Sequence, residues 1–162
     1  MTTQTSDTAV RTSIEVQAPR ERAFHVFTAE MGSWWPADHH ILPGELDEMV
    51  LEPRTGGRIY DRGTDGSECT WARVLAYEPP ERFAFSWDIS LAWQVETEPA
   101  KASEVEVRFV ALDAERTLVE LEHRHLERHG EGWEQMRAAV ASAGGWDRGL
   151  QALAAVLSEP AR

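Results

Sequence analysis

Apolar and polar residues alternate over residues 10–17, which predicts a β-strand with Ile14 and Val16 on one face. Pro19 then opens a helical segment, as a first-turn proline can. Its apolar residues recur at helical spacing, and Gly32 and Pro36 end the pattern. The chain therefore begins with a strand that leads directly into a short amphipathic helix.

Strand-like patterns then follow one another from residue 45 to residue 127, separated by glycine and proline turn signals. We expect six further strands, at approximately residues 46–54, 58–62, 68–77, 82–89, 104–112 and 117–126. The connections are short enough for hairpins, so the seven strands are predicted to form an antiparallel meander.

The last two strands show the clearest alternation. Their apolar residues face inward, and continuing the same parity places His123 and His125 inward as well. The glutamates between the apolar positions are predicted to form a solvated sheet face, and they are Glu104, Glu106, Glu120 and Glu122.

The C-terminal segment has an apolar stripe of helical period that begins at Trp133 and continues after Trp146. Gly144 and Gly145 interrupt it, and two glycines inside a helix favour a kink or a break. The expected fold class is therefore α+β, with a curved sheet wrapped around a long, bent C-terminal helix.

Length and charge narrow the class of protein. The 162 residues suit one domain, which we place at residues 9–158, with a disordered tail at 1–8 and a short tail at 159–162. The net charge of −12 opposes binding to nucleic acid or to anionic membrane surfaces. The polar N-terminus has no signal-peptide pattern, and the single Cys69 fits a reducing compartment, so we expect a cytoplasmic location.

The strongest short motifs for chemistry are absent from the sequence. No phosphate-binding loop, nucleophile elbow, Cys-x-x-Cys or zinc-protease motif is present, so we predict no cofactor and no catalytic residue. His123 and His125 could hold a metal with a partner from the His39–His40 segment. Histidines that line a polar cavity are the stronger interpretation, because no carboxylate or thiolate stands at a conventional ligand spacing, and we therefore predict no metal.

Seven tryptophans are more than a domain of this size requires for its core. Large rings that remain uncovered can line a pocket that stacks on a ligand. The residues that we expect to border such a cavity between the sheet and the closing helix are Tyr60, Trp87, His123, His125, Trp133 and Met136.

Four segments together resemble a known family. They are residues 14–24 (IEVQAPRERAF), 34–36 (WWP), 78–87 (EPPERFAFSW), and 122 onward through GEGW at 130–133 to GGW at 144–146. The chain resembles the START-like, helix-grip (SRPBCC) superfamily, in particular the branch similar to the activator of the heat-shock chaperone ATPase. The resemblance implies a curved seven-stranded sheet, two short helices after the first strand, and a cavity between sheet and C-terminal helix. It transfers no catalytic residue, because members that bind hydrophobic ligands, cyclases, dehydratases and co-chaperones share no catalytic set.

Three functions stay open at this point. The leading hypothesis is binding of a small hydrophobic or aromatic ligand in the cavity. The second is a cyclase- or dehydratase-like enzyme, with His123 or His125 as acid or base and Tyr60 or Arg58 as an orienting donor. The third is a protein that modulates a chaperone ATPase through its acidic outer face, and a homodimer is an open alternative for its assembly.

Overall fold

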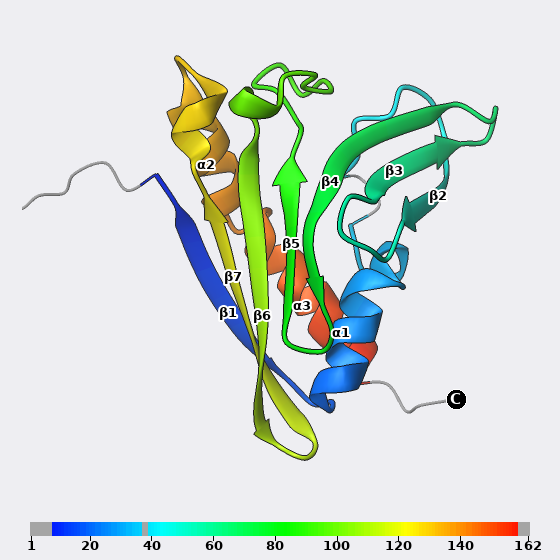
Figure 1. Ribbon diagram of the computed structural model, residues 1–162, viewed down its shortest axis with the longest axis vertical. Helices are drawn as coiled ribbons and strands as arrows, with labels where there is room; N and C mark the ends of the chain where they lie inside the picture. The colour runs from blue at the N-terminus through cyan, green and yellow to red at the C-terminus, as the bar shows by residue number, and fades with distance from the viewer. Residues whose placement is uncertain (1–7, 37–38, 159–162) are drawn as a thin grey trace, which may run out of the picture.

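A computed structural model describes residues 8–36 and 39–158 as one seven-stranded antiparallel sheet with helices on its concave side (Figure 1). The strand order is β1-β7-β6-β5-β4-β3-β2, so every strand except β1 lies beside its neighbour in sequence. The tails predicted at residues 1–8 and 159–162 lie, apart from Thr8, outside the described residues. No helix in the described part of the chain is long and apolar enough to cross a membrane.

All seven predicted strands are present, and their bounds differ from the prediction by a few residues. The strands are β1 (Val10–Val16), β2 (Leu46–Leu51), β3 (Arg58–Gly63), β4 (Glu68–Glu78), β5 (Arg82–Trp87), β6 (Ser103–Asp113) and β7 (Arg116–Arg124). The largest difference is in β2, which ends at Leu51, shortly before Pro53, a residue that cannot donate a ladder hydrogen bond.

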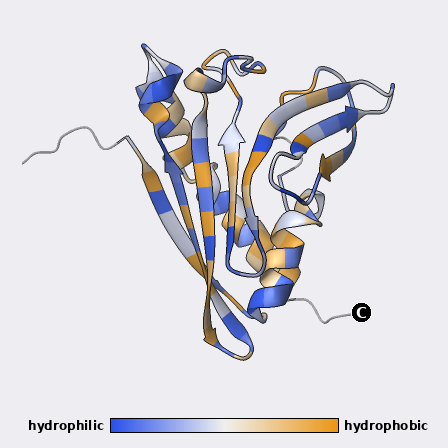
Figure 2. Cartoon of the chain, in the orientation of Figure 1, coloured by the Kyte–Doolittle hydropathy of each residue, from blue (hydrophilic) through white to orange (hydrophobic). Residues whose placement is uncertain are grey.

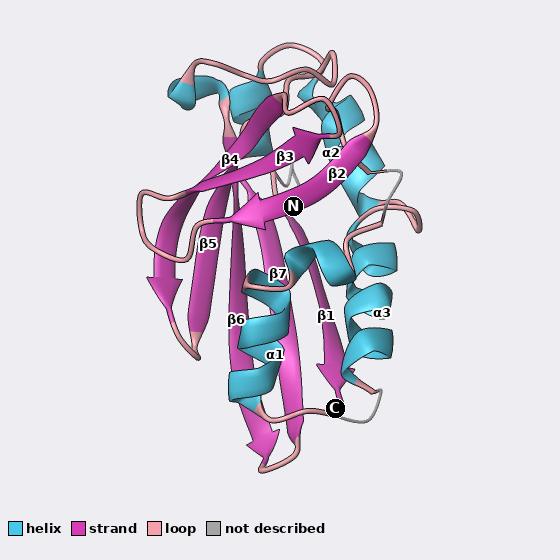
Figure 3. Ribbon diagram, turned by 90° about the vertical axis from the view of Figure 1, so that its right-hand side faces the viewer, coloured by secondary structure: helices cyan, strands magenta, loops and turns pink. Residues whose placement is uncertain are grey.

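The helices are α1 (Arg20–Thr28), α2 (Trp133–Ala141) and α3 (Trp146–Leu157), with short 3-10 turns η1 (Met31–Ser33), η2 (Pro99–Lys101) and η3 (Leu126–His129). Figure 3 shows α1 and α3 standing side by side in front of the sheet. The two short helices expected after the first strand are therefore α1 and η1. The C-terminal helix is long and bent, as predicted.

The bend between α2 and α3 has a steric cause at Gly145. A side-chain Cβ built on this residue would lie 2.3 Å from the carbonyl oxygen of Val140 and 2.7 Å from that of Ala139. Gly144 has open space at the same position, because no atom lies within 4 Å. The break therefore depends on the second glycine, which lets the backbone fold back against the last turn of α2.

The core lies between the concave face of the sheet and the inner faces of α1 and α3. Figure 2 shows hydrophobic and hydrophilic residues alternating along the strands, as a sheet with one covered face requires. Phe24 and Phe27 of α1 pack edge-on against Phe109 of β6, with ring centroids 5.2 and 5.6 Å apart. This covered face holds α1 and α3 in a fixed position relative to the sheet.

One prediction about the outer face is wrong. Glu106 was expected in solvent, but its side chain is only 8% exposed. It pairs with Arg82 of β5 and with Arg124 of β7, whose guanidinium Nη1 lies 3.0 Å from the carboxylate. These arginines hold the pKa of Glu106 below its usual value despite the opposing effect of burial. The long arginine side chains cover the carboxylate, which strand alternation alone does not predict.

Candidate functional site

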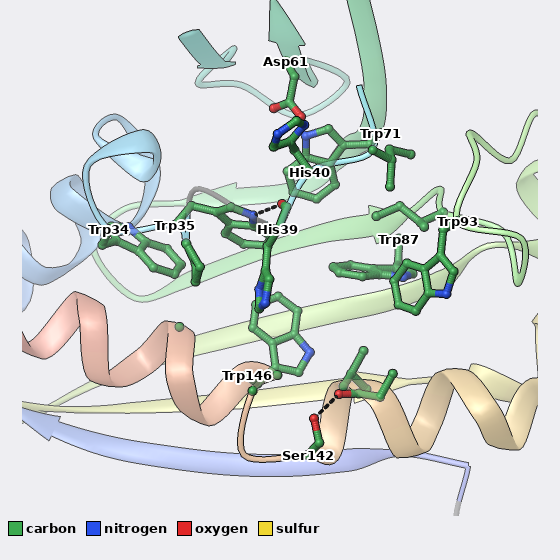
Figure 4. Close-up of a pocket in the computed structure, with 18 residues that line it drawn as sticks. Trp34, Trp35, His39, His40, Asp61, Trp71, Trp87, Trp93, Ser142 and Trp146 are labelled. Atoms are coloured by element: carbon green, nitrogen blue, oxygen red, sulfur yellow. Dashed lines mark hydrogen bonds between the residues drawn. The ribbon is translucent and has the colours of Figure 1, made fainter. Parts of the chain in front are cut away.

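A cavity of about 480 Å³ opens between the sheet, the loop after η1, and the bend of the C-terminal helix (Figure 4). This volume lies within the range of small-molecule sites. Six of the seven tryptophans line it: Trp34, Trp35, Trp71, Trp87, Trp93 and Trp146. The tryptophan excess in the sequence is therefore concentrated in the wall of one cavity.

The loop after η1 supplies two of these rings, and each is fixed by a hydrogen bond to the backbone. The indole N–H of Trp34 donates to the carbonyl oxygen of Val26 at 3.2 Å, and that of Trp35 donates to the carbonyl oxygen of His39 at 2.7 Å. The Trp35 ring lies 5.1 Å from Trp71 across the cavity wall. The loop and the sheet thus form one continuous aromatic surface.

A β-bulge lies at Trp71. Tyr60 pairs with Thr70 and Ile59 pairs with Ala72, so Trp71 is the extra residue of β4 opposite β3. Trp71 is buried in phase with Cys69, and the bulge, which interrupts the alternation, leaves the next residue, Ala72, buried as well. Trp71 then meets Trp87 of β5 edge-on, with ring centroids 6.0 Å apart.

A series of buried side-chain hydrogen bonds supports another part of the cavity wall, and it begins at Trp146, the first residue of α3. Its indole N–H donates to Nδ1 of His123 at 3.1 Å. Because the indole can only donate, Nδ1 is the accepting nitrogen and the neutral His123 carries its proton on Nε2. Nε2 donates to the hydroxyl of Ser103 at 2.8 Å, and that hydroxyl donates to Nε2 of His129 at 2.7 Å.

This arrangement keeps His123 uncharged. The side chain is completely buried, and burial together with the nearby His129 lowers the pKa of His123 to about 3. Burial also lowers the pKa of His129, against a smaller opposing effect of Glu96. Both ring nitrogens of His123 are engaged, and the ring lies behind Trp87 and Trp146, so its role is to hold the aromatic wall.

Several polar atoms in the cavity wall have no hydrogen-bond partner among the described residues. They are the indole nitrogens of Trp71 and Trp87, both carboxylate oxygens of Asp61, and Nδ1 of His40. Native proteins satisfy most buried polar groups, so such a concentration in one wall indicates a place where a ligand or water completes the bonding.

Asp61 is the most unusual of these groups. It is a carboxylate on β3, next to the edge strand of the sheet, and it is 1% exposed, with Met49 of β2 and Cys69 of β4 as its strand partners. Burial raises the pKa of Asp61, and the neighbouring Trp71 indole and His40 offset part of that rise. Asp61 is in phase with the fully buried Ile59, and this parity was the sequence signal that could have identified it.

Of the six residues predicted to border the cavity, Trp87 lines it and the other five are not among the lining residues. Tyr60 is buried under the Arg58 guanidinium, 4.3 Å from its ring centroid. Met136 packs in the core, and Trp133 lies partly buried at the start of α2.

The prediction that strand alternation points the side chain inward is confirmed for His123. It is wrong for His125, because β7 ends at Arg124. His125 instead has a φ of 61° and precedes η3, so strand alternation no longer applies to it.

The described residues contain no group of three or more histidine, cysteine, aspartate or glutamate side chains arranged to hold an ion. Cys69 is buried, and burial together with Asp61 raises the pKa of its thiol, which disfavours the reactive thiolate.

Comparisons with solved structures support the same architecture. The anthrahydroquino-gamma-pyrone synthase Txn09 is 38% identical, with a TM-score of 0.65, and the match covers 91% of this chain and 96% of that one. The self-sacrificing resistance protein CalC from Micromonospora echinospora is 27% identical, with a TM-score of 0.65 and coverages of 93% and 94%. A protein from Mesorhizobium loti at 16% identity, TM-score 0.65 and coverages of 94% and 99%, shares the fold.

A search of curated proteins finds no match. Residues 17–158, which include both helices of the bend and every residue of the cavity wall, match the family described as Activator of Hsp90 ATPase homolog 1-like protein. The sheet, the bent closing helix and the cavity between them agree with that match. The chain therefore belongs to the Activator of Hsp90 ATPase homolog 1-like family, within the START-like helix-grip superfamily.

Proposed function

We propose that this protein binds a small planar aromatic molecule in the tryptophan-lined cavity. The observation that carries the proposal is the gathering of six indole rings around one cavity of about 480 Å³. Indole faces bind flat aromatic ligands by offset or edge-on stacking, which favours such ligands over aliphatic ones of equal volume.

Polar atoms in the wall narrow the ligand class. The unpartnered indole N–H groups of Trp71 and Trp87 are donors, so they favour a ligand with carbonyl or phenolic oxygens on its ring edge. A polycyclic hydroxyquinone has this combination of flat rings and edge oxygens. The similarity to Txn09, whose name describes an anthrahydroquino-gamma-pyrone product, supports the same class.

Trp93 is the ring at the cavity with the largest exposure, 48%, and its φ is 60°. A bulky residue with positive φ is strained, and such strain clusters at ligand sites. Removal of this ring costs little core packing. Trp93→Ala therefore separates an effect on ligand affinity from an effect on protein stability better than a change at a buried tryptophan does.

Titration with 1-hydroxyanthraquinone, followed by tryptophan fluorescence and by calorimetry, tests the proposal. We expect saturable binding by the wild type and an affinity about tenfold lower for Trp93→Ala, which corresponds to about 1.4 kcal/mol. Trp133→Phe is the matched control, because Trp133 is partly buried but lies outside the cavity wall, and it should bind as the wild type does. No saturation by the wild type, or equal loss in both variants, would refute cavity binding.

A further inference from the structure

Stacking on indole rings does not require a buried carboxylate, yet the cavity wall contains one. Asp61 is 1% exposed, and neither of its oxygens has a partner among the described residues. A buried carboxylate opposes folding, and the Trp71 indole and His40 offset only part of the effect of burial on Asp61. Its position in the wall of a ligand cavity therefore calls for a functional explanation.

His40 supplies the complementary group. It comes from the loop before β2, lines the same cavity, and lies close enough to Asp61 to act on its charge. Figure 4 shows its ring directly beneath the Asp61 carboxyl group, next to Trp71. Of its two ring nitrogens, only Nδ1 is both buried and without a partner.

These two unsatisfied groups complement each other. An N–H at Nδ1 needs an acceptor and a carboxylate oxygen can accept, so a hydrogen bond between the two would satisfy both groups. A carboxylate that holds a histidine in one tautomer leaves the other nitrogen free to accept a proton, which is the general arrangement of a histidine base.

We propose that His40 and Asp61 form an acid–base pair, in which His40 exchanges a proton with an aromatic ligand in the cavity and Asp61 positions the His40 ring. The inference rests on the proposed function, because the ligand must first occupy the cavity. His40 is the residue that touches the ligand, and Asp61 is a positioning residue that acts through it.

The chemical step is a redox-neutral proton transfer. Nε2 of His40 takes a proton from an acidic O–H or C–H bond of the ligand, and the electron pair of that bond remains on the ligand. The unpartnered indole N–H of Trp87 is a donor in the same wall for an oxygen that gains negative charge. Return of the proton to another atom of the same ligand completes an isomerisation, such as a tautomerisation or ring closure, without any co-reactant.

The titratable groups nearest His40 and Asp61 do not compete with His40 as the base. Cys69 faces Asp61 from β4, and burial raises the pKa of its thiol. Arg148 of α3 lies 3.3 Å from Nε2 of the adjacent His39, so its charge is directed to that residue. The two buried histidines behind the wall, His123 and His129, are linked through the hydroxyl of Ser103, and neither lines the cavity.

A generic aromatic carbon acid, 5-nitrobenzisoxazole, tests the pair without knowledge of the natural substrate. When a base removes its ring C–H proton, the N–O bond breaks and a yellow cyanonitrophenolate forms, so the reaction is followed by absorbance. We expect saturation kinetics with the wild type and a loss of at least tenfold in kcat for His40→Gln. His25→Gln is the matched control, because His25 is exposed on α1 and its partner is Glu30.

Asp61 requires a readout that a purely structural role would not change. We expect Asp61→Asn to lower kcat at least tenfold with KM within about twofold of the wild type, and Asp61→Glu to restore part of kcat. Asp47→Asn, an exposed carboxylate on the neighbouring β2, is the control and should leave both constants unchanged. Nitrogen chemical shifts of His40 should report protonation at Nδ1 in the wild type and a mixture of tautomers in Asp61→Asn.

The outcomes separate the two proposals. If tryptophan quenching shows that the wild type binds 5-nitrobenzisoxazole, but its turnover equals that of His40→Gln, the acid–base pair is overturned and ligand binding is left intact. A parallel fall in kcat and in thermal stability for Asp61→Asn, without rescue by glutamate, would overturn the positioning role. Absence of any aromatic binding would overturn both proposals.

Discussion

Substitution of Gly145 by alanine tests whether a steric requirement sets the bend of the closing helix. The new Cβ would lie 2.3 and 2.7 Å from two carbonyl oxygens at the end of α2. These are backbone atoms, which cannot rotate away as the end of a side chain can, so the two helices must move apart. Forced packing of this kind costs about 1–3 kcal/mol, and for a domain of this size each kcal/mol lowers Tm by about 2–4 °C.

Gly144→Ala is the matched control, because its Cβ has no atom within 4 Å. Alanine restricts the unfolded chain, so we expect this variant to be unchanged or more stable by up to about 1 kcal/mol. Thermal and urea unfolding followed by circular dichroism measure both variants. We expect Tm to fall by about 2–12 °C for Gly145→Ala only. An equal effect at both positions would refute the reasoning, since chain flexibility rather than the close approach would then govern the bend.

Three further predictions concern groups around the cavity and on the outer face. The pKa of His123 is about 3 in the folded protein against 6.5 ordinarily, so the unfolded state binds the extra proton and stability falls as pH drops below 6.5. Between pH 6.5 and pH 5, the free energy of unfolding measured with urea should fall by about 2 kcal/mol more for the wild type than for His123→Gln. Equal decreases in the two proteins would contradict this prediction. Glu106→Gln should lower the free energy of unfolding by about 1 kcal/mol, because it removes the charge that Arg82 and Arg124 share, while Glu78 and Glu104 still pair with these two arginines; a similar cost for the exposed Glu120→Gln would show that pairing is not the cause. Cys69 should react with a thiol reagent only after unfolding, and rapid labelling of the native protein would show that its burial is incomplete.

Local patterns predicted the architecture well. Alternation located all seven strands, and the apolar stripe with its glycine pair located both pieces of the closing helix and the break between them. These features depend on residues within a few positions of each other, because the spacing of apolar residues along a strand or a helix can be read directly from the sequence. The one strong failure on the sheet, Glu106, came from arginines on the two neighbouring strands.

The candidate site was predicted only in part. The number of tryptophans indicated an aromatic pocket, and Trp87, which was expected to border it, lines the cavity. Asp61 was not identified, and His40 was considered only as part of a segment that could supply a metal ligand. Asp61 lies on a strand, in phase with Ile59, and His40 lies on a loop 21 positions earlier, so no local pattern links the two. They line the same cavity because β3 and the loop after η1 both border it.

The order of apolar and polar residues was therefore sufficient to specify the strands, the helices and the break at Gly145, because each depends on local period and on backbone sterics. Which residues form and support the cavity wall depended on interactions between residues that are distant in the sequence. A bulge in β4 leaves both Trp71 and Ala72 buried, a hydrogen bond from Trp146 fixes His123 behind the wall, and the fold places His40 near Asp61. Burial, tautomer and the absence of a partner are properties of surroundings, and residues distant in the chain create those surroundings only when the sheet closes around its helix.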